Sequence, residues 1–207
     1  PMEHKGIIGE HLDHFFDDLY AGEDTWEKAE RKMLSTAVDA AIQKSGIQPT
    51  EIGVYLAGDL LNQNITASFS AQKLGIPFMG IYGACSSSML SMTLGASLVS
   101  GGFTQHAVVG VSSHNCTAEK QYRYPTEYGG QKPNTAQWTV TGAGAAVVGK
   151  TVTGPRVRYA TIGKVMERGV KNPFDMGSAM APAAADTIIT HFQETGRTPE
   201  DYDLIVT

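Results

Sequence analysis

The sequence repeats a short stretch of itself at a separation of 150 residues. Residues 45–56 align without gaps on residues 195–206, and the two segments share a glycine (Gly46, Gly196) and a proline (Pro49, Pro199). Such a match can arise by chance, because helix–Gly–turn–Pro–strand is a common connection from a helix to a strand. Here it coincides with the place where the order of strands and helices starts again. The repeat therefore predicts two similar α/β halves, one at residues 1–150 and the beginning of a second at residues 151–207.

The stretch around Cys85 is the second constraint on the fold. Residues 78–82 form an apolar run that predicts a buried strand, and residues 89–99, apolar on nearly every side, predict a buried helix. Serines at positions 86–88 are candidate N-caps for that helix. Cys85 is then expected at a strand-to-helix elbow, where the helix dipole stabilises a thiolate and backbone N–H groups can hold a carbonyl oxygen or a carboxylate. The alternative is a small buried cysteine that only packs.

The rest of the chain predicts a mixed succession of helices and strands. An apolar stripe at residues 15–20 predicts a short helix, and Asp24 or Thr25 is expected to cap the next helix, which ends at Gly46. The face of that helix toward the core is expected to hold Ala29, Met33, Ala37, Ala40, Ala41 and Ile42. The other predicted segments are strands at 52–57, 105–112 and 157–165, a strand pair or bulged strand at 139–148, helices at 66–74 and from 175 through 192, and a long irregular loop at 120–137.

Charge and cysteine content exclude several classes of protein. The formal charge of −5 argues against nonspecific nucleic-acid binding, which needs a basic face. Two cysteines do not make a disulfide framework, so a reducing compartment is expected. No stretch has the length and continuity of a membrane-spanning helix, and no signal peptide opens the chain. The chain starts without a methionine and stops inside a predicted strand, so it is expected to be a fragment.

Paired α/β halves with a cysteine at the amino end of a buried helix resemble the thiolase-like superfamily of thiolases and ketoacyl synthases. In that superfamily the cysteine accepts the acyl group. Residues 141–148 resemble the Gly-x-Gly-Ala strand that closes the first half in ketoacyl synthases. The resemblance implies a thiolase-like layered α/β/α fold, in which the first half is nearly complete but lacks its first strand and the second half is truncated.

Longer runs resemble one branch of the superfamily, the stage V sporulation protein AD family. The runs that carry this resemblance are residues 22–24, 57–64, 112–115, 123–133 and 172–187. That family, from spore-forming Firmicutes, is implicated in loading dipicolinic acid into the developing spore, together with membrane partners of the same operon. The resemblance implies dipicolinic acid and the other proteins of the spore membrane complex as partners, and a homodimer. It also implies a location in the cytoplasm or at the periphery of the forespore or spore inner membrane.

An enzymatic role is the alternative that the resemblance leaves open. In catalytic relatives the second half supplies the histidine and the other polar residue that serve the cysteine. Those positions lie outside this chain, so the resemblance favours a pocket reused for binding over chemistry. The alternative function is that of an acyltransferase or condensing enzyme of the thiolase or ketoacyl synthase type, with Cys85 at the nucleophile position.

Dipicolinate is a flat aromatic dianion, so its site needs Arg or Lys, helix-end N–H groups and an apolar or aromatic slot. The residues expected to supply these groups are Cys85, Ser86, Ser87, His114, Asn115, Arg123, Tyr128 and Lys132. The histidine and asparagine follow a strand at the sheet edge where open α/β folds collect ligands, and the last three lie in the long loop. The alternatives are a structural histidine and solvated loop charges. No cofactor or protein-bound metal is expected, although calcium can accompany the ligand.

Overall fold

The computed structural model describes residues 9–122, 139–151, 154–172 and 175–207. These residues form two compact units. The first contains the described residues up to 155 and the second those from 156 onward. Each unit is described by itself below.

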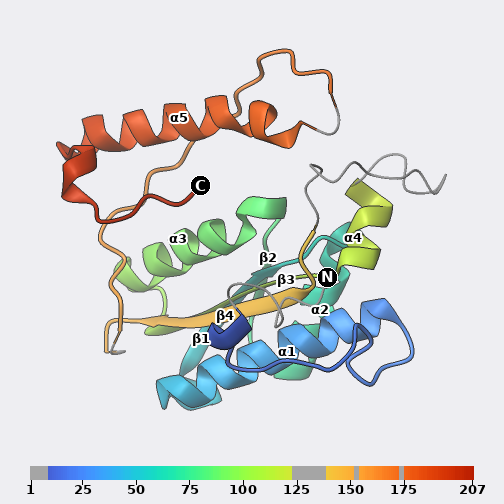
Figure 1. Cartoon of the computed structure of the whole chain (residues 1–207). Helices are drawn as coiled ribbons and strands as arrows, with labels where there is room; N and C mark the ends of the chain where they lie inside the picture. The colour runs from blue at the N-terminus through green and yellow to red at the C-terminus, as the bar shows by residue number, and fades with distance from the viewer. Residues whose placement is uncertain (1–8, 123–138, 152–153, 173–174) are drawn as a thin grey trace. The chain divides into compact units, whose positions relative to one another are not determined.

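The first unit is built on a four-stranded sheet in the order β2-β1-β3-β4. Its strands are β1 (Ile52–Gly58), β2 (Phe78–Gly80), β3 (His106–Ser113) and β4 (Gly142–Gly149). The first three run parallel, with Tyr55 opposite Phe78 in β1/β2 and Leu56 opposite Val109 in β1/β3. The last strand runs antiparallel to β3 (Figure 1). Residues 139–148 therefore contribute one strand and not a strand pair.

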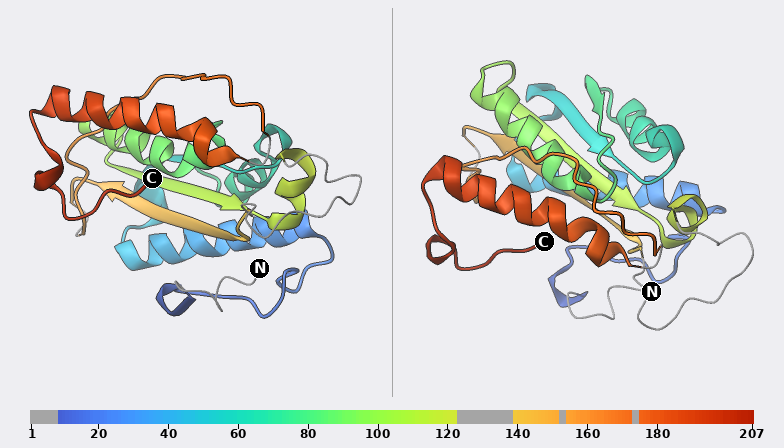
Figure 2. Two further views of the ribbon diagram at one scale, coloured as in Figure 1. Left: turned by 45° about the horizontal axis from the view of Figure 1, so that its top comes forward. Right: turned by 90° about the horizontal axis from the view of Figure 1, so that it is seen from above.

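Helices cover both faces of this sheet. On one face, α1 (Trp26–Ser45) and α2 (Ile65–Leu74) pack against Tyr55 and Val108. On the other face, α3 (Ser87–Ser100) packs against Leu56 and Val109, because successive side chains of a strand point to opposite faces (Figures 1 and 2). The predicted layered α/β/α architecture is confirmed.

The ends of the helices follow the local chemistry of the sequence. Thr25 caps α1 by accepting a hydrogen bond from the backbone N–H of Lys28 at 3.2 Å. Gly46 ends the same helix in the left-handed conformation, with φ 70°, and Gly75 ends α2 with φ 68°. The helix α4 (Asn115–Tyr122) follows β3 directly. It takes up the first residues of the predicted loop at 120–137, and the rest of that loop lies outside the described residues.

Helix α3 differs from its prediction as a helix buried on every side. Its buried residues are Ser87, Ser91, Gly95 and Val99, which lie four apart along one stripe, whereas Met89 is 63% exposed. The small residues bring the helix close to the sheet: a methyl group on Gly95 would lie 3.0 Å from Cγ1 of Val109. The small-residue stripe sets the close approach of this helix, and Leu90, Met92, Leu94 and Leu98 beside it are only partly buried against the core.

The predicted short helix at residues 15–20 does not form. Only the 3-10 turn Gly9–His11 precedes α1 in the described part of the chain. The carboxylate of Asp18 accepts hydrogen bonds from the N–H groups of Tyr20 and Ala21, and Ala21 has φ 52°. These side-chain bonds turn the backbone where a helix would have continued.

The second unit contains α5 (Met176–Thr195), which confirms the helix expected from residue 175. Residues 157–165, predicted to be a strand, are irregular and have no partner strand among the described residues. A side-chain contact holds this segment instead, because Nδ1 of His191 lies 2.8 Å from Oγ1 of Thr161. On the other side of the ring, Nε2 of His191 lies 2.7 Å from the hydroxyl of Tyr202.

The 150-residue repeat is present in the structure. Helices α1 and α5 begin at residues 26 and 176 and end at residues 45 and 195. Gly196 repeats the left-handed φ of Gly46, at 67° against 70°. The 3-10 turns Pro49–Glu51 and Pro199–Asp201 follow at the same interval. The two copies therefore agree in their caps and turns as well as in their helices.

Candidate functional site

The elbow before α3 holds an exposed cysteine. Residues Ala84–Ser86 form a 3-10 turn between β2 and α3, and Cys85 is exposed with a free thiol. The residue before it, Ala84, has φ 45°, a left-handed conformation that an alanine rarely adopts. The predicted strand-to-helix elbow is therefore present, with Cys85 on its surface.

The serines of the elbow do not cap α3 in the expected way. Ser86 stands at the N-cap position but makes no side-chain hydrogen bond to the helix, and its hydroxyl donates to the carbonyl of Gly83 at 2.7 Å. Ser87 is 2% exposed, and its buried Oγ has no hydrogen-bond partner among the described residues. That hydroxyl points into the protein, since a methyl group on Gly58 would lie 3.1 Å from it. Of the predicted ligand-binding residues at the elbow, Cys85 and Ser86 are exposed and Ser87 is buried.

His114 is fully buried and both of its ring nitrogens contact the protein. Nε2 lies 2.8 Å from the carbonyl oxygen of Leu19, and Nδ1 accepts a hydrogen bond from the N–H of Cys116 at 3.2 Å. This pattern places the proton on Nε2. Burial lowers the pKa of His114, which favours the neutral ring. The ring also stacks on Trp26 of α1, with 6.2 Å between centroids. These are the contacts of a structural histidine.

Asn115 joins the start of α4 to the segment before β4. Its backbone N–H donates to Oγ1 of Thr141 at 2.8 Å, and its side-chain amide donates to the carbonyl of Thr139 at 2.9 Å. The remaining predicted residues, Arg123, Tyr128 and Lys132, lie outside the described residues.

Glu30 is a buried acid that sequence reasoning missed. It is fully buried in α1, where Ser112 donates to its Oε1 at 2.9 Å and Thr117 Oγ1 lies 3.1 Å from its Oε2. Burial, the main cause, raises the pKa of Glu30 to about 7. The Thr117 hydroxyl also lies 3.1 Å from the carbonyl of His114, and it has a single proton to donate. Thr117 therefore shares this proton between the Glu30 carboxyl group and the His114 carbonyl. Its burial could have been predicted from the sequence, because Glu30 lies four and eight residues before Leu34 and Val38 on the buried face of α1.

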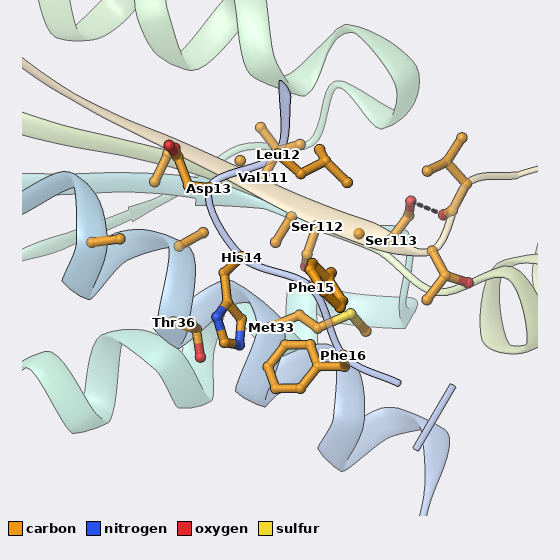
Figure 3. A pocket seen from close by; sticks show the side chains of 18 of the residues that line it. Leu12, Asp13, His14, Phe15, Phe16, Met33, Thr36, Val111, Ser112 and Ser113 are labelled. Carbon is orange, nitrogen blue, oxygen red and sulfur yellow. Dashed lines mark hydrogen bonds between the residues drawn. The ribbon is translucent and has the colours of Figure 1, made fainter. Parts of the chain in front are cut away.

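A cavity of about 620 Å³ lies on the α1 side of the sheet. Residues 11–19 pass over it, α1 forms one wall, and the ends of β3 and β4 form the other (Figure 3). The side chains shown around it include Leu12, Phe15, Phe16, Met33, Val111, Ser112 and Ser113 (Figure 3). Ala37, Ala40 and Ala41, expected to belong to the core face of α1, line this cavity instead. Among the described residues, Cys85, Ser86, Ser87, His114 and Asn115 are not part of the cavity lining.

No group of three or more His, Cys, Asp or Glu side chains among the described residues is arranged to hold a metal ion. None of the helices in the described part of the chain is long and apolar enough to cross a membrane.

Solved structures with a similar backbone show the fold. OleA from Xanthomonas campestris, solved with bound lauric acid and lauroyl-CoA, is 16% identical with a TM-score of 0.61, over 84% of this chain and 59% of that one. The tetronic acid condensing enzyme AbyA1 is 18% identical with a TM-score of 0.56, over 92% of this chain and 64% of that one. At these identities the likeness concerns the fold alone, which is thiolase-like.

Sequence comparison gives the family. The family model described as stage V sporulation protein AD matches residues 1–207. The stage V sporulation protein AD of Bacillus subtilis (strain 168) is 51% identical over all 207 residues, and the chain spans 61% of that relative's length. The chain belongs to the stage V sporulation protein AD family.

Proposed function

We propose that this protein binds dipicolinic acid and takes part in its uptake into the developing spore. Family membership supports a role in sporulation. The structural observation that carries the binding proposal is the exposed elbow at Cys85. There the Ser86 side chain is turned back to Gly83 and leaves the amino end of α3 without a side-chain cap from that residue. Backbone N–H groups and the helix dipole at such an end favour a carboxylate.

The ligand has a second carboxylate and an aromatic ring, which need further partners. Arg123, Tyr128 and Lys132 are proposed for these roles, because arginine and lysine pair with carboxylates and a tyrosine ring stacks on a flat ligand. Calcium is proposed to accompany the ligand and not to reside in the protein, and no other cofactor is proposed. The proposed partners are the other proteins of the spore membrane complex, with a second copy of the chain forming a homodimer.

Isothermal titration of dipicolinate into the full-length protein, with and without calcium, tests the binding proposal. We expect saturable binding with one ligand per chain. Pyridine-2-carboxylate keeps the ring and one carboxylate, so it is the matched control ligand and should bind more weakly. Absence of binding under both conditions would overturn the proposal.

The exposed thiol of Cys85 in a thiolase-like fold supports acyl transfer as a second candidate function. In the first step the thiolate would attack the carbonyl carbon of an acyl-CoA, and the CoA thiolate would leave as the new thioester forms. Intact mass measurement after incubation of the full-length protein with acyl-CoA tests this step. An adduct on Cys85 would favour the enzyme, and an unmodified protein would remove this candidate.

A further inference from the structure

We propose that the cavity beneath residues 11–19 is a second binding site and that it takes a small, uncharged, apolar molecule. The cavity has a volume of about 620 Å³, within the range of roughly 300–1,000 Å³ that is usual for small-molecule sites. It belongs entirely to the first unit and includes none of the elbow residues at Cys85. The proposal is therefore independent of dipicolinate binding.

Small residues on two facing elements create the space. Ala37, Ala40 and Ala41 line it from α1, and Ala143 and Ala145 line it from β4. A sheet and a helix that pack directly normally fill the gap between them with larger side chains. Met33 and Lys44 are the larger α1 side chains in the lining, at either end of this alanine stretch, and the alanines leave the space between them open.

The segment that roofs the cavity is attached near both of its ends. Asp13 forms an ion pair with Lys44 at the end of α1, and the carbonyl oxygen of Leu19 contacts Nε2 of His114 at 2.8 Å. Between these attachments the roof presents Phe15 and Phe16 among the lining residues (Figure 3). A roof fixed at two points with aromatic side chains between them gives a ligand a large apolar contact surface.

The polar groups around the cavity indicate an uncharged ligand. Ser113 donates to the carbonyl of Val140 at 2.6 Å, and Ser112 donates to Glu30 at 2.9 Å. Oγ1 of Thr141 accepts the backbone N–H of Asn115 at 2.8 Å. Because these three hydroxyl groups already have protein partners, a polar ligand would gain little from them. The lining also includes the polar side chains of His14 and Thr36, which leave a ligand few hydrogen bonds compared with the apolar surface it buries.

The charges at the cavity also indicate an uncharged ligand. Asp13 and Lys44 neutralise each other across the roof and α1. The carboxylate of Asp18, which also lines the cavity, is bonded to the N–H groups of Tyr20 and Ala21. Lys44 is the one lysine among the described lining residues and it is paired with Asp13, so a dianion such as dipicolinate finds no unpaired lysine there and faces the carboxylate of Asp18. The site therefore differs in ligand class from the one proposed at the elbow.

Titration of the full-length protein with the neutral fluorophore N-phenyl-1-naphthylamine tests this inference. We expect an emission increase that saturates at one probe per chain and that dipicolinate does not reverse. Ala41→Leu and Ala143→Leu, which fill the cavity from opposite walls, should each weaken binding at least tenfold. Gln43→Leu places the same side chain at an exposed position on α1 outside the cavity and should change the affinity less than twofold.

Other outcomes would overturn the inference. These are no saturable binding by the unsubstituted protein, equal binding by all three variants, or displacement of the probe by dipicolinate. Circular dichroism melting verifies that each variant is folded. If one cavity-filling variant does not fold, the variant on the opposite wall decides the test.

Discussion

Ser112 at the end of β3 donates a hydrogen bond to Glu30 in α1, with 2.9 Å between Oγ and Oε1 across 82 residues of sequence. The same carboxyl group lies 3.1 Å from the hydroxyl of Thr117 in α4. A single buried acid thus joins three elements of the first unit.

The substitution Glu30→Gln should make the free energy of unfolding less dependent on pH, because the variant has no buried acid to ionise as the pH rises. Burial raises the pKa of Glu30 from 4.5 to about 7, so its contribution is fully present below pH 4.5 and is lost as the pH rises through 7. A shift of this size corresponds to about 3 kcal/mol in the free energy of unfolding. Urea unfolding should show that, between pH 5 and pH 8.5, the unsubstituted protein loses more free energy of unfolding than Glu30→Gln does. Glu27→Gln, at an exposed position on the same helix, is the matched control. Equal pH dependence in the protein and in Glu30→Gln would contradict the assignment.

Ala84→Gly should stabilise the protein. Ala84 has φ 45°, where an L-residue is strained by roughly 1–2 kcal/mol and glycine is not. Because glycine also loses more backbone entropy on folding, we expect a net gain of about 0.5–1 kcal/mol in urea unfolding. Ala41→Gly, within the helix α1, should instead lose about 1 kcal/mol. A loss for Ala84→Gly would show that the turn is not strained.

Ser87→Ala should be neutral or stabilise the protein by about 1 kcal/mol. The hydroxyl of Ser87 is buried without a partner among the described residues, and an unpaired buried polar group costs free energy. Ser91→Ala is the control one turn later, because Ser91 is equally buried but donates to the carbonyl of Ser88 at 3.0 Å. Thermal melting should separate the two variants. A large loss in Ser87→Ala alone would instead reveal a partner for that hydroxyl.

Gly46→Ala and Gly196→Ala should destabilise the protein by similar amounts, about 1 kcal/mol each. Both glycines are left-handed and a methyl group on either would meet no atom within 4 Å, so only the backbone conformation opposes the change. Asparagine at either position should cost less, because it tolerates this conformation better. Gly144→Ala is the control, since it too has open space around it but no positive φ. Urea unfolding that finds no difference between Gly46→Ala and Gly144→Ala would contradict this explanation.

The substitution Cys85→Ala distinguishes a ligand-binding role of Cys85 from a role as a nucleophile. If Cys85 only borders the ligand, dipicolinate affinity measured by titration should change less than threefold. If it is a nucleophile, the variant should lose the acyl adduct completely, whereas Cys116→Ala should keep it. A tenfold or greater loss of dipicolinate affinity in Cys85→Ala would show that the thiol contacts the ligand more directly than we propose.

The parts of the fold that could be predicted are those determined by neighbouring residues. Thr25 and Gly46 mark the ends of α1 through interactions within a few residues, and Gly46 was identified from the sequence, with Thr25 as one of two candidate caps. The helix expected at residues 15–20 was wrong, because the periodic pattern does not show that Asp18 bonds the backbone two and three residues later. The strand expected at residues 157–165 was also wrong, because an apolar run forms a strand only when a partner strand pairs with it.

The candidate site, like the fold, could be predicted only where it depends on neighbouring residues. The strand-to-helix elbow at Cys85 follows from local sequence and is present in the structure, whereas the ligand-binding role of its residues stays a prediction. The burial of His114 depends on Leu19, 95 residues earlier, and on Trp26, and neither contact has a local signal. The cavity requires the small residues of α1 and of β4 to face each other on one side of the sheet. Their sizes could be read from the sequence, but their apposition could not.

The paired helices α1 and α5 have a consequence for how this sequence can vary during evolution. Their N-caps are chemically different, Thr25 and Asp175, yet both accept the N–H three residues later, at 3.2 and 3.0 Å. The turns after them reuse one design, in which Glu51 and Asp201 accept the N–H of the residue three positions earlier. Turn geometry restricts substitution more than helix faces do, because the turn acids satisfy backbone N–H groups. An alignment of homologues should therefore show Gly46, Gly196 and the two turn acids changing more slowly than the helices they follow.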